Sequence, residues 1–284
     1  MTAIPLQREI HYPESDGQPM AETELHREEM TYLIQALQSW YRDEPDIHVG
    51  GNLFLYYVQG NPRAVVSPDV YVIVVKGEGD KFFCAGANIN MLKSSDPYFK
   101  YYFCLHANET LTRLEQTPKL VIAALEGHTV GGGLEIAMAA DILIARKGSG
   151  KVGLPEVTLG VLPGTGGTQR LARSLGKAKA IQLMCEGTTF DFEEAQRIGI
   201  VNHIFDGDDF AGQVHEYARQ FCPPNKAAKA VGRIKRSVQS GAEVPFESGL
   251  AIERELQQQL FESPDAREGL DAYVGKRKPD FRGW

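Results

Sequence analysis

The sequence predicts an α/β protein built on a parallel β-sheet. Short apolar segments alternate with segments rich in helix-forming residues along most of its 284 residues, an order typical of strands joined through helices. Two runs, Val70–Val75 and Leu120–Leu125, are apolar at successive positions, as expected of strands covered on both faces. The third observation is a glycine triplet, Gly131–Gly133, followed by helix formers. It predicts a tight turn between a strand and a helix.

The N-terminal quarter is predicted to be irregular α+β structure. Ala21–Arg42 carries an apolar stripe at helical spacing, and Ile47–Val58 contains Gly50-Gly51-Asn52 between two β-rich pieces, a hairpin pattern. One apolar stripe needs a partner to bury it, and a lone hairpin is too small to be stable in water. We therefore expect residues 20–75 to pack with the sheet rather than fold independently.

The rest of the chain is predicted to form an α/β core and a helical C-terminal region. The expected domains are 1–72, 73–220 and 221–284. Beyond the elements above, we expect helices over 134–140, 101–115, 169–185, 190–199, 225–240 and 246–261, and a strand over 200–205.

Composition narrows the classes of function. The chain is 43% hydrophobic and 24% charged, as in ordinary globular proteins, and its net charge of −7 gives no general reason to bind nucleic acid. No apolar run approaches the ~18 residues of a membrane span. The 4 cysteines show no CxxC spacing and the histidines no metal-ligand spacing. We expect reduced thiols, a cytoplasmic location, and no metal, membrane or nucleic-acid partner.

Two glutamates follow glycine-containing signatures and form the candidate site. The signatures are Gly131-Gly132-Gly133-Leu134-Glu135 and Gly153-Leu154-Pro155-Glu156. Backbone N–H groups at a helix start have no intrahelical partner, so the glycine turn can bind an oxygen that becomes negative. Glu135 lies about one helical turn further along, and carboxylates can move protons. A glycine triplet before a helix also occurs for packing alone, so neighbouring motifs must decide.

Four motifs occur in an order that resembles the enoyl-CoA hydratase (crotonase) family. They are Phe83–Ile89, Gly131–Glu135, Gly153–Glu156 and Leu162–Leu171, and the resemblance covers about residues 70–284. It implies a crotonase-like spiral of ββα turns, followed by a helical region that assembles homotrimers or hexamers. The family's usual first turn is missing, so the atypical N-terminal segment is expected to replace it.

The resemblance also implies roles for individual residues. The N–H groups of Ala87 and Gly132 would bind the thioester oxygen, Glu135 would activate water, and Glu156 would give a proton to the α-carbon. Asn88 departs from the more frequent aspartate. A coenzyme A thioester is implied as substrate, without a separate cofactor. Other substrate-binding positions are Ala85, Gly86, Asn88, Ile89, Gly131, Pro155, Gly164 and Lys276.

Retention of both glutamates favours a hydratase that converts a trans-2-enoyl-CoA into a 3-hydroxyacyl-CoA. Isomerases, hydrolases and decarboxylases of the family commonly lack one of them. The sequence does not decide which carboxylate is protonated. Two alternatives stay open: another acyl-CoA isomerase or lyase, and a non-catalytic fusion protein with an incomplete coenzyme A site.

Residues 12–73 resemble the front part of a bacterial PD-(D/E)xK nuclease-fold family. Asp69 would be the first carboxylate of its divalent-metal site. No lysine in the sequence has Asp or Glu two positions before it, so the (D/E)xK element is absent. We interpret the segment as structural and expect no nuclease activity.

Overall fold

The computed structural model describes residues 55–56, 65–66 and 72–283, and the chain separates into two compact units, 1–70 and 71–284. In the first unit, β1 (Leu55–Tyr56) pairs antiparallel with β2 (Val65–Val66). The predicted hairpin spans Ile47–Val58, so β2, which pairs with β1, lies outside it. The first half of that hairpin, the helix expected over 21–42, and Asp69 lie outside the described residues, so the nuclease resemblance and the 1–72 segment stay predictions.

Two four-stranded sheets form the framework of the second unit. The first is entirely parallel and has the order β10-β7-β5-β3; the second has the order β4-β6-β8-β9, with only β9 antiparallel to its neighbour. This confirms the predicted α/β class. The strands of the first sheet are β3 (Ile73–Lys76), β5 (Val121–Leu125), β7 (Ile142–Arg146) and β10 (His203–Phe205), and those of the second are β4 (Phe82–Cys84), β6 (His128–Val130), β8 (Lys151–Gly153) and β9 (Phe190–Asp191).

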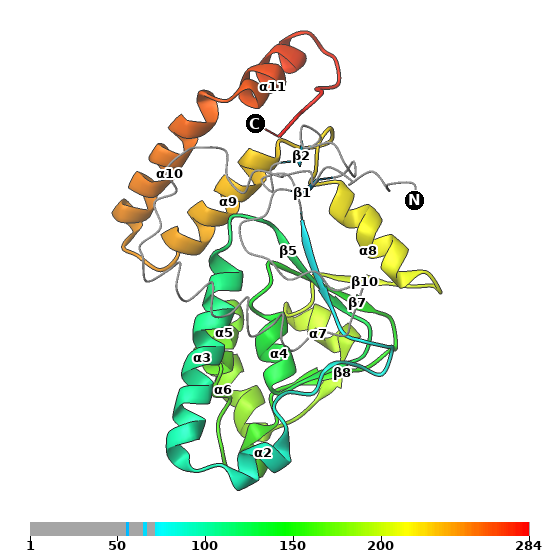
Figure 1. Ribbon diagram of the computed structural model, residues 1–284, viewed down its shortest axis with the longest axis vertical. Coiled ribbons are helices and arrows are strands. Elements are labelled where there is room, and N and C mark those ends of the chain that lie inside the picture. The colour runs from blue at the N-terminus through cyan, green and yellow to red at the C-terminus, as the bar shows by residue number, and fades with distance from the viewer. Residues whose placement is uncertain (1–54, 57–64, 67–71, 284) are drawn as a thin grey trace, which may run out of the picture. The chain divides into compact units, whose positions relative to one another are not determined.

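Helices surround the sheets and continue into a C-terminal extension, as Figure 1 shows. They are α2 (Ile89–Ser94), α3 (Pro97–Gln116), α4 (Gly132–Ala137), the 3₁₀ helix η1 (Glu156–Leu159), α5 (Gly167–Leu175), α6 (Lys177–Glu186), α7 (Phe192–Ile198), α8 (Phe210–Arg219), α9 (Ala228–Gly241), α10 (Phe246–Phe261) and α11 (Pro264–Val274).

Two helix predictions need correction, and two further helices were not predicted. The helix expected over 169–185 is two helices, because Gly176 has a φ of 80° and ends α5 before α6 begins. The helix expected from Phe190 starts later, because Phe190–Asp191 pairs with β8. Asp191 then caps α7 by accepting from the Glu194 N–H at 2.8 Å. Helices α8 and α11 were not predicted; side chains of Asp209 and Ser263 cap them.

The continuous apolar pattern of β5 is explained by two cores on opposite faces of its sheet. Ala123 and Leu125 belong to one cluster, with side chains from α4, α5 and α7. Ile122 and Ala124 belong to a second cluster, with side chains from α8. Successive side chains of a strand point to opposite faces, so a strand covered on both sides must be apolar throughout.

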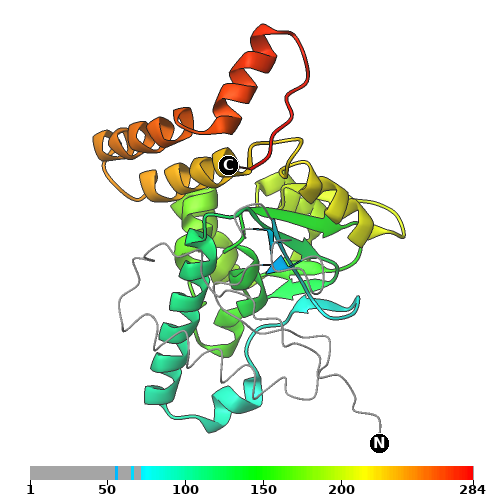
Figure 2. The same cartoon turned by 45° about the horizontal axis from the view of Figure 1, so that its top comes forward.

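The three C-terminal helices extend away from the sheets (Figures 1 and 2). A buried ion pair fastens α9 to the core: the Lys235 Nζ lies 2.8 Å from the Asp141 carboxylate and donates to the Lys119 carbonyl at 2.9 Å. Large apolar side chains on α10 and α11 face solvent, with Phe246 74% and Tyr273 86% exposed. Among the described residues, no helix is both long and apolar enough to cross a membrane.

Candidate active site

Two backbone N–H groups from separate loops lie side by side. Gly86, in the loop after β4, has a φ of 85°, and a Cβ on it would lie 2.9 Å from the Gly132 nitrogen at the start of α4. A Cβ on Gly132 would lie 3.7 Å from the Ala87 nitrogen. The Asn88 side chain fixes the end of the loop by accepting from the N–H groups of Asn90 and Met91. Asparagine therefore supplies the helix cap that an aspartate would supply.

The glycine triplet is needed because other backbone segments approach it closely. The Gly131 N–H donates to the Gly153 carbonyl at 2.9 Å, and Gly131 has a φ of 61°, which favours glycine. A Cβ on Gly133 would lie 1.9 Å from the Cys84 carbonyl oxygen. These contacts bring the N-terminus of α4 against the loop that carries Ala87. The triplet thus serves packing and at the same time creates the pair of adjacent amides.

Glu135 is buried, with 2% of its surface exposed, and is surrounded by donors. Its Oε1 accepts from the N–H groups of Thr165 at 2.8 Å and Gly167 at 2.7 Å. Its Oε2 accepts from the Thr165 hydroxyl. Donors on both oxygens suit a carboxylate anion, which can only accept.

Glu156, at the start of η1, lies beside the same glycine turn. Its Oε1 is 3.1 Å from the position that a Cβ on Gly131 would take. Its Oε2 is buried and has no hydrogen-bond partner among the described residues. Burial raises the pKa of Glu156 above the ordinary value of 4.5, and the negative charge of Glu135 raises it further. The site therefore combines a carboxylate that accepts three hydrogen bonds with one whose pKa is raised by burial.

Comparison with known proteins identifies the family. Residues 63–283 match the sequence model of the enoyl-CoA hydratase/isomerase family. The chain belongs to this family. It is 34% identical over 239 residues to the 2,3-dehydroadipyl-CoA hydratase of Escherichia coli K12, covering 81% of this chain and 88% of that protein. It is 36% identical over 210 residues to the short-chain-enoyl-CoA hydratase of Clostridium acetobutylicum, covering 74% and 79%.

Solved structures of the family agree with the fold. A crystal structure of an enoyl-CoA hydratase from Geobacillus kaustophilus has a TM-score of 0.73 and 42% identity, covering 90% of this chain and 88% of that one. The enoyl-CoA hydratase of Bacillus anthracis has a TM-score of 0.71 and 28% identity, covering 92% and 94%. The crotonase-like fold predicted from the four motifs is confirmed.

Most of the predicted substrate-binding positions gather around these groups. Ala85 and Gly86 flank the Ala87 amide, Asn88 caps α2, and Pro155 precedes Glu156. Gly164 lies before the loop that binds Glu135, and its carbonyl accepts from the Asn108 side chain at 3.4 Å.

Ile89 follows Asn88 at the start of α2, and its side chain is 55% exposed. Lys276 follows α11, which lies at the far end of the ribbon from α2 in Figures 1 and 2. Helix α11 also lies away from α4, which carries Glu135, in Figure 1, so Lys276 is not brought together with this carboxylate.

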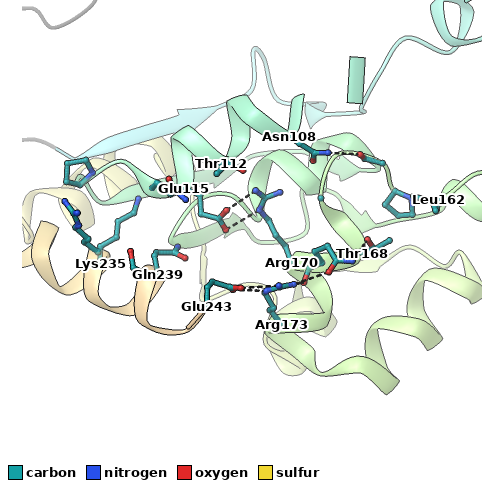
Figure 3. A pocket seen from close by; sticks show the side chains of 18 of the residues that line it. Asn108, Thr112, Glu115, Leu162, Thr168, Arg170, Arg173, Lys235, Gln239 and Glu243 are labelled. Atoms are coloured by element: carbon teal, nitrogen blue, oxygen red, sulfur yellow. Dashed lines mark hydrogen bonds and ion pairs between the residues drawn. The ribbon is translucent and has the colours of Figure 1, made fainter. Parts of the chain in front are cut away.

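A cavity of about 940 Å³ lies beside the loop that carries Thr165 and Gly167. Side chains of α3, α5 and α9 line it together with Leu162–Gly164, and Ala87, Gly132, Glu135 and Glu156 are not among its lining residues (Figure 3). Among the described residues, no group of three or more metal-ligating side chains gathers. Sequence reasoning did not single out Thr165 or Gly167, although both lie in the recognised Leu162–Leu171 motif.

Proposed function

We propose that this chain is an enoyl-CoA hydratase, which adds water across the double bond of a trans-2-enoyl-CoA. One observation carries the proposal: two carboxylates face one glycine turn from different elements. Glu135 Oε2 lies 3.8 Å from the position of a Cβ on Gly132, and Glu156 Oε1 lies 3.1 Å from that on Gly131. Adding H and OH to adjacent carbons requires a base for water and an acid for the α-carbon.

The adjacent amides would bind the thioester oxygen. As the hydroxyl group adds to the β-carbon, negative charge develops on that oxygen, and the N–H groups of Ala87 and Gly132 would stabilise the enolate. A positioned donor of this kind contributes about 3–4 kcal/mol in other oxyanion holes. Among the described residues, neither N–H donates a hydrogen bond to a backbone carbonyl in the turns and loops, so both can donate to a ligand.

The surroundings of the two glutamates support a different role for each. Glu135, which has donors on both oxygens, would take a proton from water. Glu156, whose pKa is raised by burial, would give its proton to the α-carbon. The product is a 3-hydroxyacyl-CoA, and a proton passing from Glu135 to Glu156 restores the starting state.

The proposal extends to the other substrate-binding positions. Ala85, Gly86, Asn88, Ile89, Gly131, Pro155 and Gly164 would contact the substrate, and Lys276 would lie near a phosphate of coenzyme A. We expect a cytoplasmic enzyme that needs no cofactor. The apolar side chains exposed on α10 and α11 would be covered by further copies in a homotrimer or hexamer, which light scattering can measure.

Loss of the enoyl absorbance of crotonyl-CoA tests the activity. The same sample should melt at a higher temperature with a coenzyme A thioester present, because a ligand of the folded state stabilises it. Stabilisation without hydration would indicate another reaction of the family. Neither hydration nor stabilisation would indicate the non-catalytic alternative.

A further inference from the structure

Thr165 is the one described side chain that donates a hydrogen bond to Glu135. Its hydroxyl donates to Oε2, while its backbone N–H donates to Oε1 at 2.8 Å. The third donor is the Gly167 backbone N–H, 2.7 Å from Oε1. Both backbone groups would be retained by any ordinary residue at position 165, whereas the bond to Oε2 depends on the hydroxyl.

The loop that carries Thr165 is held from its other side by a charged pair. Arg170 donates from one guanidinium nitrogen to the Thr165 carbonyl at 3.3 Å. Its other nitrogens bind both oxygens of Glu115 on α3, at 3.2 and 2.9 Å, and Figure 3 shows this pair across the cavity. The Arg170 side chain is only 11% exposed. Through Glu115 and Arg170, helices α3 and α5 together hold the Thr165 backbone in position beside Glu135.

The terminal torsion of a glutamate is intrinsically loose, because rotation about an sp³–sp² bond has broad minima. Two donors on Oε1 alone fix that atom but leave Oε2 to turn about it. A hydroxyl on Oε2 fixes the plane of the carboxylate and hence the direction of its remaining lone pairs. A general base depends on such alignment with the proton that it removes.

We propose that Thr165 is the positioning residue of Glu135, and that its hydroxyl holds the carboxylate plane in the orientation that activates water. This inference rests on the proposed hydratase function. Thr165 acts through Glu135 rather than on the substrate, so its hydroxyl should affect kcat and leave KM nearly unchanged.

The test compares Thr165→Val with Thr165→Ser. Valine keeps the shape and the backbone N–H and removes the hydroxyl, whereas serine keeps the hydroxyl. We expect kcat for crotonyl-CoA to fall about 10-fold in Thr165→Val, the usual weight of one hydrogen bond to a charged group. KM should stay within about twofold, and Thr165→Ser should recover most of the rate. Thr168→Val is the matched control, since within the described part of the chain the Thr168 hydroxyl makes one hydrogen bond, accepting from the Gln169 side chain at 3.2 Å.

The outcomes separate this inference from the proposed function. A wild-type protein that hydrates no enoyl thioester contradicts the function. A hydrating wild type with an unchanged Thr165→Val rate, or an equal loss in Thr165→Ser, contradicts the role of the hydroxyl. Crystal structures of both variants provide a readout that needs no activity: the Glu135 carboxylate should turn in Thr165→Val alone. An unmoved carboxylate would also overturn the inference.

Discussion

Glu135 and Glu156 face the same glycine turn from opposite surroundings. Glu135 follows the turn on α4 and accepts bonds from Thr165 and Gly167. Glu156 opens η1, and one of its oxygens is buried without a partner among the described residues. Identical side chains thus acquire different chemistry from the loops around them. The loop that carries Thr165 and Gly167, rather than the signature that contains Glu135, supplies the donors that distinguish its surroundings from those of Glu156.

The largest effect should come from converting either carboxylate to its amide. Glu135→Gln and Glu156→Gln should each lower the hydration of crotonyl-CoA by roughly 10²–10⁴-fold, the usual weight of a general acid or base. Loss of the enoyl absorbance measures both rates. If one variant keeps the wild-type rate, that glutamate has no part in the mechanism and the comparison fails.

A smaller effect should follow from crowding Glu135 without changing it. A Cβ on Gly167 would lie 3.0 Å from Glu135 Oε1 and 2.8 Å from the Pro163 Cβ. Gly167→Ala should therefore displace the base and lower kcat by roughly 10–100-fold, since small misplacements of catalytic groups have effects of this size.

Gly241→Ala is the control for this substitution. The nearest atom to a Cβ on Gly241, at the end of α9, is 3.7 Å away, an ordinary contact. Steady-state kinetics of the two variants should differ. Equal rates would show that the fit of Gly167 against Glu135 does not matter for catalysis.

Sequence patterns predicted the elements whose surroundings are uniform. β5 is buried at all of its positions and was predicted from its apolar run. Helix α10 was predicted with its observed bounds, Phe246–Phe261. The break at Gly176 was missed because apolar spacing continues across it, while the backbone turns there with a φ of 80°. Helices that depend on a capping side chain more than on an apolar stripe, such as α11, were also missed.

The sequence predicted only part of the site, because local patterns show some of its residues and not the contacts between distant ones. Local signatures contain Glu135, Glu156 and the glycine turn, so the motifs reveal them. The environment of Glu135 is made by residues 30 and 32 positions away in the chain. Only the folded backbone shows that Thr165 points at this carboxylate. The sequence therefore could not decide which glutamate is protonated, and the contacts support an assignment.

The smallest effect concerns thermal stability. Replacing the two glutamates by glutamine should change the melting temperature in opposite directions. Burial raises the pKa of Glu156 in the folded protein above 4.5, so the folded state holds this proton more tightly than the unfolded state does. Stability from this group is present below pH 4.5 and is lost as the pH rises through the raised pKa.

The glutamine in Glu156→Gln does not titrate. Because burial disfavours the charged form, we expect Glu156→Gln to raise Tm at pH 8, and this gain should disappear near pH 4. Glu135→Gln should instead lower Tm at pH 8, since charge-assisted bonds from Thr165 and Gly167 are weakened. Thermal melting of both variants at pH 4 and pH 8 measures this, and shifts of the same sign at pH 8 would refute the contrast between the two sites.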